Sequence, residues 1–298
     1  MRDFFRNTKP FGQLLTLVVA IVLFFIVASG LEMVAVLCGI DVLAPRQILW
    51  QQGVIQLITF LLPALLVAWL FSDSAVRFMK IPVAKPAKVQ ILAAVVVLLL
   101  MIPCVDWLTT LNDNWHWGSA LKIYEEHLRA IGDRSEALVN SLLSLNYPGS
   151  FWCLLLVMAL VPAVCEEFLF RGAVQQLLQR CCRNPHVAIL LTAAIFSLVH
   201  GEFFSFLPRF ALGILLGYLF YYGSSIWVNV AAHFVNNAIV VVFSVLYNRG
   251  QLTVNPTDDI AAPWYVVLAG LLLAGLLFWW IFLRQNSEKG TPSTPELQ

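Results

Sequence analysis

The chain has 298 residues, of which 60% are hydrophobic and 12% are charged, and its formal net charge is +1. Soluble domains contain about 25% charged residues, so this composition excludes a water-soluble globular protein. The sequence also has no basic patch with interleaved aromatic residues, which argues against nucleic acid as a partner. We therefore predict an all-α polytopic protein whose surroundings are the lipid bilayer.

The apolar segments predict about eight transmembrane helices. The first apolar run follows a basic N-terminus and has about 25 residues, longer than a signal-peptide core of about 7–15 residues, so we interpret it as an uncleaved span. Each span needs about 20 apolar residues. The predicted helices cover residues 13–38, 48–71, 88–111, 151–181, 186–201, 206–222, 225–247 and 263–283, the fifth of which is short.

The segment from 112 to 150 is polar and charged, although leucines recur along it. We predict a surface segment with one or two amphipathic helices at the membrane interface, between the third and fourth spans. The polar residues 286–298 have nothing to bury, which predicts a disordered tail. Residues 1–285 then form a single integral-membrane domain, with a motif-bearing core at about 150–247.

Lys and Arg residues are distributed unevenly between the predicted loops. If the N-terminus is inside, the inner segments hold eleven of them and the outer segments hold six. Positive residues favour the cytoplasmic side of a membrane. We therefore predict a multi-pass protein of the plasma or inner membrane, with both termini in the cytoplasm.

The stretch from Cys165 to Gly172 places three ionisable side chains inside one predicted span. Each such group costs about 2.5–3.5 kcal/mol at the bilayer centre, which indicates a functional use. Glu167 and Arg171 are four residues apart and can pair on one helix face. Glu166 is turned by about 100° from Glu167, which leaves one carboxylate outside that pair. A carboxylate in apolar surroundings suits a general base or acid.

Two of the five histidines lie within predicted membrane helices. We expect His116 and His127, in the polar segment, to be solvated, and His186 to be interfacial. His200 follows Phe196 by four residues, and Asn237 follows His233 by four, so each pair shares a helix face. Two histidines, an amide and a spare carboxylate within the membrane predict a functional site.

Two other chemistries use the same region. Many catalytic zinc sites are formed by two histidines and a carboxylate. The same ligand types are available here from Glu166, His200 and His233, with Glu167, although the sequence has no His-Glu-x-x-His helix. Cys165 is an alternative nucleophile, but no histidine adjoins it in sequence and buried cysteines are commonly inert. The six cysteines form no Cys-x-x-Cys pair, so neither a disulfide framework nor a zinc knuckle is indicated.

The predicted helix 206–222 carries Arg209 and a pair of glycines, Gly213 and Gly217. Small residues four positions apart allow two membrane helices to approach closely, and we expect this role for both glycines. Arg209, near the helix start, is interpreted as an interface anchor.

Three motifs follow one another on successive predicted membrane helices: Glu166-Glu167-x-x-x-Arg171, Phe196-x-x-x-His200 and His233-x-x-x-Asn237. This ordered set, within about residues 150–247, resembles the CPBP family of CAAX proteases and bacteriocin-processing enzymes. The group is also called the Abi family, or the type II CAAX prenyl endopeptidases.

The resemblance implies an eight-helix intramembrane endopeptidase that acts on a peptide or protein substrate at the membrane. Eukaryotic relatives cleave after a prenylated cysteine, whereas bacterial members have varied substrates. The resemblance makes Glu166 the base that activates water, and His200 a residue that holds this water. It assigns oxyanion stabilisation to His233 and Asn237, and supporting roles to Glu167 and Arg171. Family members have been described both as metalloproteases and as enzymes without a catalytic metal, so zinc stays an open cofactor.

Two function classes without proteolysis use the same residues differently. A membrane immunity or scaffold protein would bind a partner through the polar cluster, and substitution of Glu166 by Gln separates binding from base catalysis. A small proton-coupled transporter is a third interpretation. Neither a broken helix pair nor an internal repeat supports a transporter.

Overall fold

The structure is a computed structural model that describes residues 5–81, 88–253 and 262–284. Within these residues it is helical and contains no strand, which confirms the predicted all-α class. The predicted disordered tail, residues 286–298, lies outside the described residues.

The first three spans are α2 (Pro10–Leu37), a composite helix, and α6 (Lys88–Asp113). The composite helix consists of α3 (Pro45–Gln56), η1 (Leu57–Leu61) and α4 (Leu62–Phe71). The short helix α5 (Ala75–Phe78) follows it.

The fourth span runs without a break from Ser150 to Cys182 and is divided into α8 (Ser150–Leu154), η3 (Leu155–Leu160), α9 (Val161–Glu166), η4 (Glu167–Gln175) and α10 (Gln176–Cys182). Four helices follow: α11 (Pro185–Val199), α12 (Phe206–Tyr222) after the short η5 (Phe203–Ser205), α13 (Ile226–Asn248), and α14 (Trp264–Phe278) continued by η6 (Trp279–Leu283).

Seven of these described helices are long and apolar enough to cross a membrane, and α11, with 15 residues, is shorter. The predicted eight helices therefore match, within a few residues at each end, seven full spans and one short helix. The short helix is the predicted fifth one.

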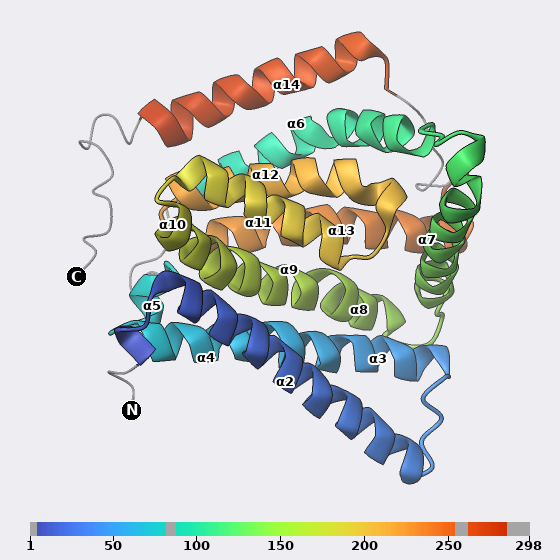
Figure 1. Cartoon of the computed structure of the whole chain (residues 1–298). Helices are drawn as coiled ribbons and strands as arrows, with labels where there is room; N and C mark the ends of the chain where they lie inside the picture. The colour runs from blue at the N-terminus through green and yellow to red at the C-terminus, as the bar shows by residue number, and fades with distance from the viewer. Residues whose placement is uncertain (1–4, 82–87, 254–261, 285–298) are drawn as a thin grey trace.

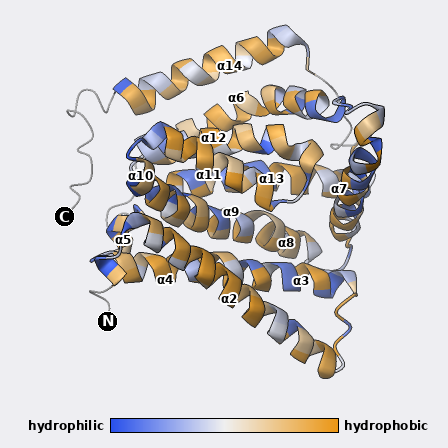
Figure 2. Ribbon diagram, in the orientation of Figure 1, coloured by the Kyte–Doolittle hydropathy of each residue, from blue (hydrophilic) through white to orange (hydrophobic). Residues whose placement is uncertain are grey.

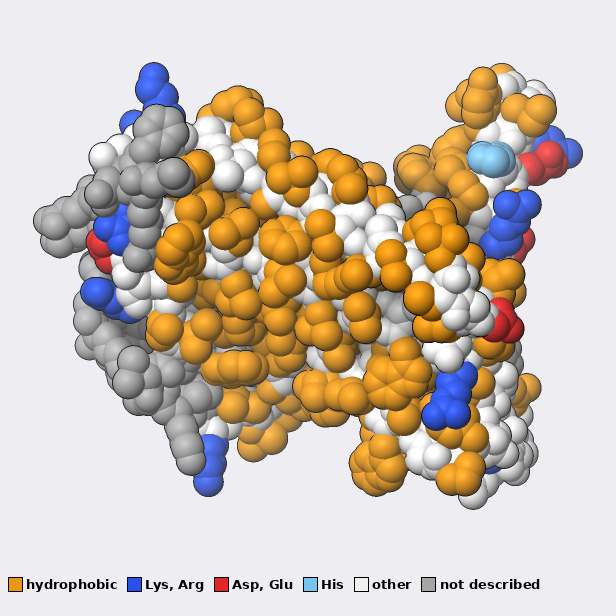
Figure 3. Space-filling view, turned by 90° about the horizontal axis from the view of Figure 1, so that it is seen from below, with side chains coloured by type: hydrophobic (Ala, Val, Ile, Leu, Met, Phe, Trp, Pro, Cys, Tyr) orange, Lys and Arg blue, Asp and Glu red, His pale blue; other side chains and the backbone are white. Residues whose placement is uncertain are grey.

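The spanning helices lie side by side, and α7 (Lys122–Leu143) stands across one end of them, opposite the end from which α2 starts (Figure 1). This is the predicted amphipathic segment, formed by one helix after the short turn η2 (Ser119–Leu121). The spanning helices are mostly hydrophobic, whereas α7 mixes polar and apolar residues (Figure 2). The space-filling view shows a broad apolar belt between two ends that carry the charged groups (Figure 3). This pattern is typical of an integral membrane protein.

The fourth span is the most enclosed one. In its most apolar part 61% of the residues are buried inside the protein, compared with 17–33% in the other six long spans. Polar groups on this span therefore face protein rather than lipid, the environment in which intramembrane charges are tolerated.

Several spans contain π-helical turns, and two of these turns have a local cause. Pro63 follows η1 and Pro162 follows η3 within two residues. A proline inside a helix has no N–H and its ring collides with the carbonyl four residues earlier, so a widened turn relieves the clash. The nine-residue η4 has no proline, and it begins at Glu167. π-Helical turns within α-helices are frequent at functional sites.

Candidate active site

The predicted pair of Glu167 and Arg171 forms at the centre of the site. Nη1 of Arg171 donates to Oε1 of Glu167 at 2.8 Å, and both side chains are fully buried. Nη2 of Arg171 donates to the carbonyl of Gly213 at 3.0 Å, and the guanidinium lies 4.9 Å from the ring centre of Phe196. The guanidinium therefore has an anion, a carbonyl and an aromatic face as neighbours, which offsets its desolvation.

His233 projects from α13 between the two neighbouring glutamates. Its Nδ1 lies 2.9 Å from Oε1 of Glu167, and its Nε2 lies 3.8 Å from Oε2 of Glu166. The sequence predicted that Glu166 would be left over, and the structure gives it this one distant partner. When the Nδ1–H of His233 donates to Glu167, Nε2 of the same ring faces Glu166. Nε2 and the Glu166 carboxylate can then share a proton.

Asn229 completes the environment of Glu167 and was missed by the sequence analysis. Its Nδ2 lies 3.3 Å from Oε2 of Glu167 and 2.6 Å from the carbonyl oxygen of Leu216, and both oxygens accept from it. The missed signal is its spacing, because Asn229, His233 and Asn237 follow one another at four-residue intervals along α13. Glu167 thus accepts hydrogen bonds from Arg171 and Asn229 and contacts Nδ1 of His233, the surroundings expected of a supporting carboxylate.

The carbonyl groups of α12 form the floor beneath these side chains. Besides Gly213 and Leu216, Gly217 accepts a hydrogen bond from Nε2 of Gln175 at 3.1 Å, a second contact that the sequence analysis missed. A Cβ at Gly213 would lie 3.0 Å from Cα of Ala193, and one at Gly217 would lie 2.7 Å from Cγ2 of Ile189. The prediction that these glycines permit close helix approach is confirmed for α11 and α12.

Phe196 and His200 extend the site along α11. The Phe196 ring centre lies 4.9 Å from that of His200 and 6.2 Å from that of His233, so Phe196 stands between the two histidines. His200 follows the last helical residue of α11 and is exposed, and its Nδ1 lies 2.7 Å from the carbonyl oxygen of Phe196. With Nδ1–H donating to that carbonyl, Nε2 becomes the nitrogen that can accept a proton or hold a water.

Asn237 lies one turn beyond His233 on α13. Its Oδ1 accepts from Nδ2 of Asn236 at 3.3 Å, which orients the amide and directs its own Nδ2 elsewhere. No contact is described between Asn237 and the glutamates. The structure therefore gathers Glu166, Glu167, Arg171, Phe196, His200 and His233 through described contacts, and Asn237 borders this group.

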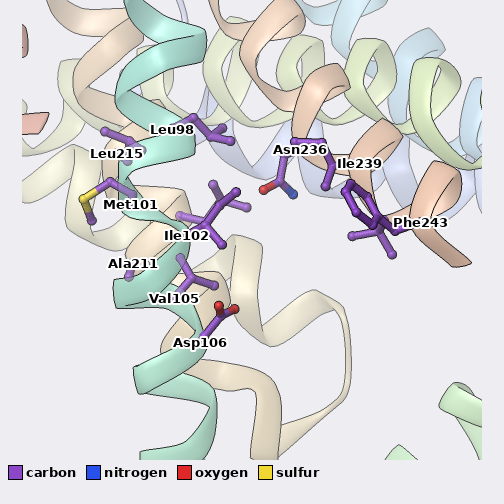
Figure 4. Close-up of a pocket in the computed structure, with 12 residues that line it drawn as sticks. Leu98, Met101, Ile102, Val105, Asp106, Ala211, Leu215, Asn236, Ile239 and Phe243 are labelled. Carbon is purple, nitrogen blue, oxygen red and sulfur yellow. The ribbon is translucent and has the colours of Figure 1, made fainter. Parts of the chain in front are cut away.

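A cavity of about 300 Å³ lies between α6, α12 and α13. Its lining is largely apolar, and it includes Ile102 and Val105 from α6 and Ile239 from α13. Asn236 and Asp106 contribute polar groups to the same cavity (Figure 4). Asn236 also donates to Asn237, and none of the predicted site residues lines the cavity itself.

The remaining candidates behave differently from the central group. Arg209, predicted to anchor the interface, pairs with Glu202, with Nη2 and Oε2 2.5 Å apart. Cys165 is buried, and no hydrogen bond joins it to a histidine in the part of the chain that the structure describes. Among the described residues no three His, Cys, Asp or Glu side chains are grouped closely enough to hold a metal ion.

Residues 148–239, from just before α8 to the middle of α13, match the family model described as "Type II CAAX prenyl endopeptidase Rce1-like". This match supports a relationship between this part of the chain and the CAAX protease family. The matched region contains every residue of the three motifs, including Asn237. No curated protein and no solved structure gives a significant match to the chain. The match to this family model supports a peptidase that meets its substrate at the membrane.

Proposed function

We propose that this protein is an intramembrane endopeptidase of the CAAX protease family that hydrolyses a peptide bond of a membrane-associated substrate through a water activated by Glu166. The observation that carries the proposal is that two adjacent carboxylates have unequal numbers of hydrogen-bond partners. Glu167 accepts from Arg171, His233 and Asn229, whereas Glu166 faces only the distant Nε2 of His233 among the described contacts. Glu166 therefore keeps the capacity to take up a proton, as a general base must.

The proposed reaction uses Glu166 and His200 on the water. Glu166 removes a proton while His200 holds the oxygen, which attacks the carbonyl carbon of the scissile bond. His233 and Asn237 donate to the oxyanion that forms, a stabilisation worth roughly 10²–10³ in rate for each donor. Glu166 then returns the proton to the leaving amine as the C–N bond breaks, so that acid and base roles belong to one carboxyl group.

The apolar cavity between α6, α12 and α13 suggests where an apolar part of the substrate lies. It is large enough for an aliphatic side chain or part of a hydrocarbon chain, and its lining residue Asn236 donates to Asn237. A C-terminally prenylated peptide is therefore one substrate to test, alongside unmodified membrane peptides.

The proposal is tested by comparing membranes from cells that express the parent chain, Glu166→Ala or His200→Ala. We expect a new cleavage product with the parent only, and a loss of roughly 10²–10⁴ in rate for Glu166→Gln on the substrate so found. Glu32→Gln is the matched control, because Glu32 is an exposed carboxylate on α2, away from the motifs. Equal processing by correctly inserted parent and Glu166→Ala would overturn the proposal.

Two alternatives are separated by the same variants. A non-catalytic immunity or scaffold protein would retain its phenotype in Glu166→Gln, because shape and hydrogen bonding are largely kept. A zinc-dependent form of the same hydrolysis would give stoichiometric zinc in elemental analysis and lose activity on chelation, whereas hydrolysis through Glu166 alone would do neither.

We also infer that both termini lie in the cytoplasm, in the plasma or inner membrane. The described segments at the end from which α2 starts carry Arg77 in α5, Lys80 in the following turn, and Lys88 and Arg183 at helix ends. At the other end α7 carries Lys122, Arg129 and Arg134, but these belong to a long segment between two spans, where the positive-inside rule has least force. A fluorescent reporter that folds only in the cytoplasm, fused to the C-terminus, should fluoresce, and a periplasmic phosphatase fused there should be inactive.

A further inference from the structure

The turn that follows His200 is held by residues outside the motif-bearing core. After α11 the chain passes through Gly201, whose φ of +73° is accessible mainly to glycine, into Glu202 and η5. The His200 side chain is at this boundary, tethered on one side by the carbonyl of Phe196. Its position on the other side depends on where residues 201–207 are fixed.

Asn112, at the end of α6, fixes the backbone of this turn at two points. Its Oδ1 accepts from the N–H of Leu207 at 2.9 Å, and its Nδ2 donates to the carbonyl of Phe203 at 3.3 Å. The Asn112 side chain is buried, so both bonds are protected from competing water.

Arg129, on α7, fixes the side chains of the same turn. Its guanidinium lies 3.8 Å from the ring centre of Phe204, a close cation–π contact. The same group donates to the carbonyls of Asp113 and Trp115 at 2.8 and 3.2 Å, which joins α7 to the end of α6. The Trp117 ring adds an edge-to-face contact with Phe203 at 5.0 Å.

Glu125 orients Arg129 and Trp117 together. Its Oε1 lies 3.0 Å from Nε of Arg129 and 2.7 Å from Nδ1 of His116, and its Oε2 accepts from the N–H of Trp117 at 2.9 Å. The backbone N–H of Trp117, followed by His116, lowers the pKa of the Glu125 carboxyl from 4.5 to about 2. Glu125 therefore stays ionised and keeps these donors in place across the physiological range.

We propose that Glu125 and Arg129 are positioning residues for His200, which act by clamping the Phe203–Leu207 turn from α7 and the end of α6. Neither residue belongs to the matched family region or contacts the buried glutamates. The clamp is a chain of contacts from Glu125 through Arg129 to Phe204, and its effect on catalysis rests on the proposed function. Its effect on the geometry of His200 does not depend on the proposed function.

The experiment compares Glu125→Gln with the matched control Glu126→Gln in the full chain in nanodiscs. Glu126 is the next residue of the same helix, and its one ion pair among the described residues is an exposed i, i+4 contact with Lys122 at 3.7 Å. The two variants remove the same charge from the same helix. Arg129→Lys is a third variant, and we expect it to behave like Glu125→Gln, because a lysine can replace neither the stacked plane nor the forked donors.

Two measurements report the clamp without any substrate. Hydrogen exchange followed by mass spectrometry should be faster at residues 203–207 in Glu125→Gln and unchanged in Glu126→Gln. The rate at which diethylpyrocarbonate modifies His200, read on its own peptide, should change several-fold in Glu125→Gln only. If Glu125→Gln and Glu126→Gln are alike in either measurement, the clamp is overturned even where the proposed hydrolysis is correct.

A third measurement links the clamp to the reaction. On a cleaved substrate, Glu125→Gln should lower kcat with little change in KM and alter the pH profile of kcat, since a misplacement of about 1 Å can cost about 10²-fold in rate. A general loss of folding would lower kcat and the amount of inserted protein together, without a change in the pH profile. If neither the parent nor any variant cleaves a substrate, the proposed function fails. Hydrogen exchange and diethylpyrocarbonate modification still test whether the clamp exists.

Discussion

The protein contains the same trio of side chains twice, in two different environments. On α7, Glu125 pairs with Arg129 four residues later and with His116, and within the membrane Glu167 pairs with Arg171 four residues later and with His233. The Glu–Arg distances are 3.0 and 2.8 Å, and the Glu–His distances are 2.7 and 2.9 Å. The local geometry is therefore almost equal, and the difference lies in the surroundings.

The exposure of the side chains separates the two trios. In the α7 trio the side chains of Glu125, Arg129 and His116 are 10%, 30% and 71% exposed, whereas Glu167 and Arg171 are 0% exposed and His233 is 4% exposed. Water can replace a lost partner in the first trio, but not in the second. The same three residue types thus make a surface clamp in one place and the inner support of a candidate active site in the other.

The largest expected effect comes from breaking the buried pair. Arg171→Leu leaves the Glu167 carboxylate buried without its main counter-charge, and we expect a loss of about 3–5 kcal/mol in the free energy of unfolding. The equivalent change on α7, Arg129→Leu, should cost less, about 1 kcal/mol, since Arg129 is partly exposed and water can reach this pair. Unfolding in mixed detergent micelles measures both. Similar losses for the two variants would show that the contrast in exposure is energetically unimportant.

A smaller effect is expected from the amide that supports Glu167. Asn229→Leu removes the hydrogen bonds to Glu167 and to the carbonyl of Leu216, and leaves both acceptors buried. We expect a loss of about 1–3 kcal/mol in the free energy of unfolding. Asn236→Leu serves as control, because Asn236 is half-buried beside the cavity. An Asn229→Leu variant as stable as the parent would remove Asn229 from the set of supporting residues.

The smallest effect is the pH dependence of the α7 trio. The folded pKa of Glu125, about 2, lies below its ordinary value of 4.5, so its carboxylate contributes stability that is fully present above pH 4.5 and is lost as the pH falls towards 2. Hydrogen exchange at residues 203–207, corrected for the intrinsic rate, should therefore lose protection over this range in the parent. Glu125→Gln should lack that dependence, and the same pH response in both would assign it to another group.

The sequence predicted the local parts of this molecule and missed the parts made by packing. The Glu167–Arg171 pair, the apolar spans and the short fifth helix follow from spacing and length, and the structure contains them. The bridge from His233 to both glutamates was missed, because it joins α13 to the fourth span across 66 residues of sequence. The roles of Asn229 and Gln175 were also missed, although both continue four-residue polar spacings.

The α7 region shows the same limit, because its helix was predicted but its contacts with other elements were not. The sequence predicted an amphipathic helix there and a solvated His116. The His116 ring is indeed largely exposed. The sequence could not indicate that His116 also contacts Glu125. Nor could it indicate that Arg129 lies against Phe204, in the turn between α11 and α12. These contacts depend on how α7 is laid across the end of the bundle, which periodicity does not encode.

The short α11 has a consequence for the membrane itself. Its 15 residues give a length of about 22 Å, against a hydrocarbon thickness of about 30 Å. Leu198 and Val199, next to His200, are nonetheless exposed apolar residues. Hydrophobic mismatch of this kind thins the adjoining bilayer, which brings the headgroup region down towards the His200 turn. The proposed proteolysis should therefore respond to the acyl length of the surrounding lipids, and be favoured where the bilayer is thin.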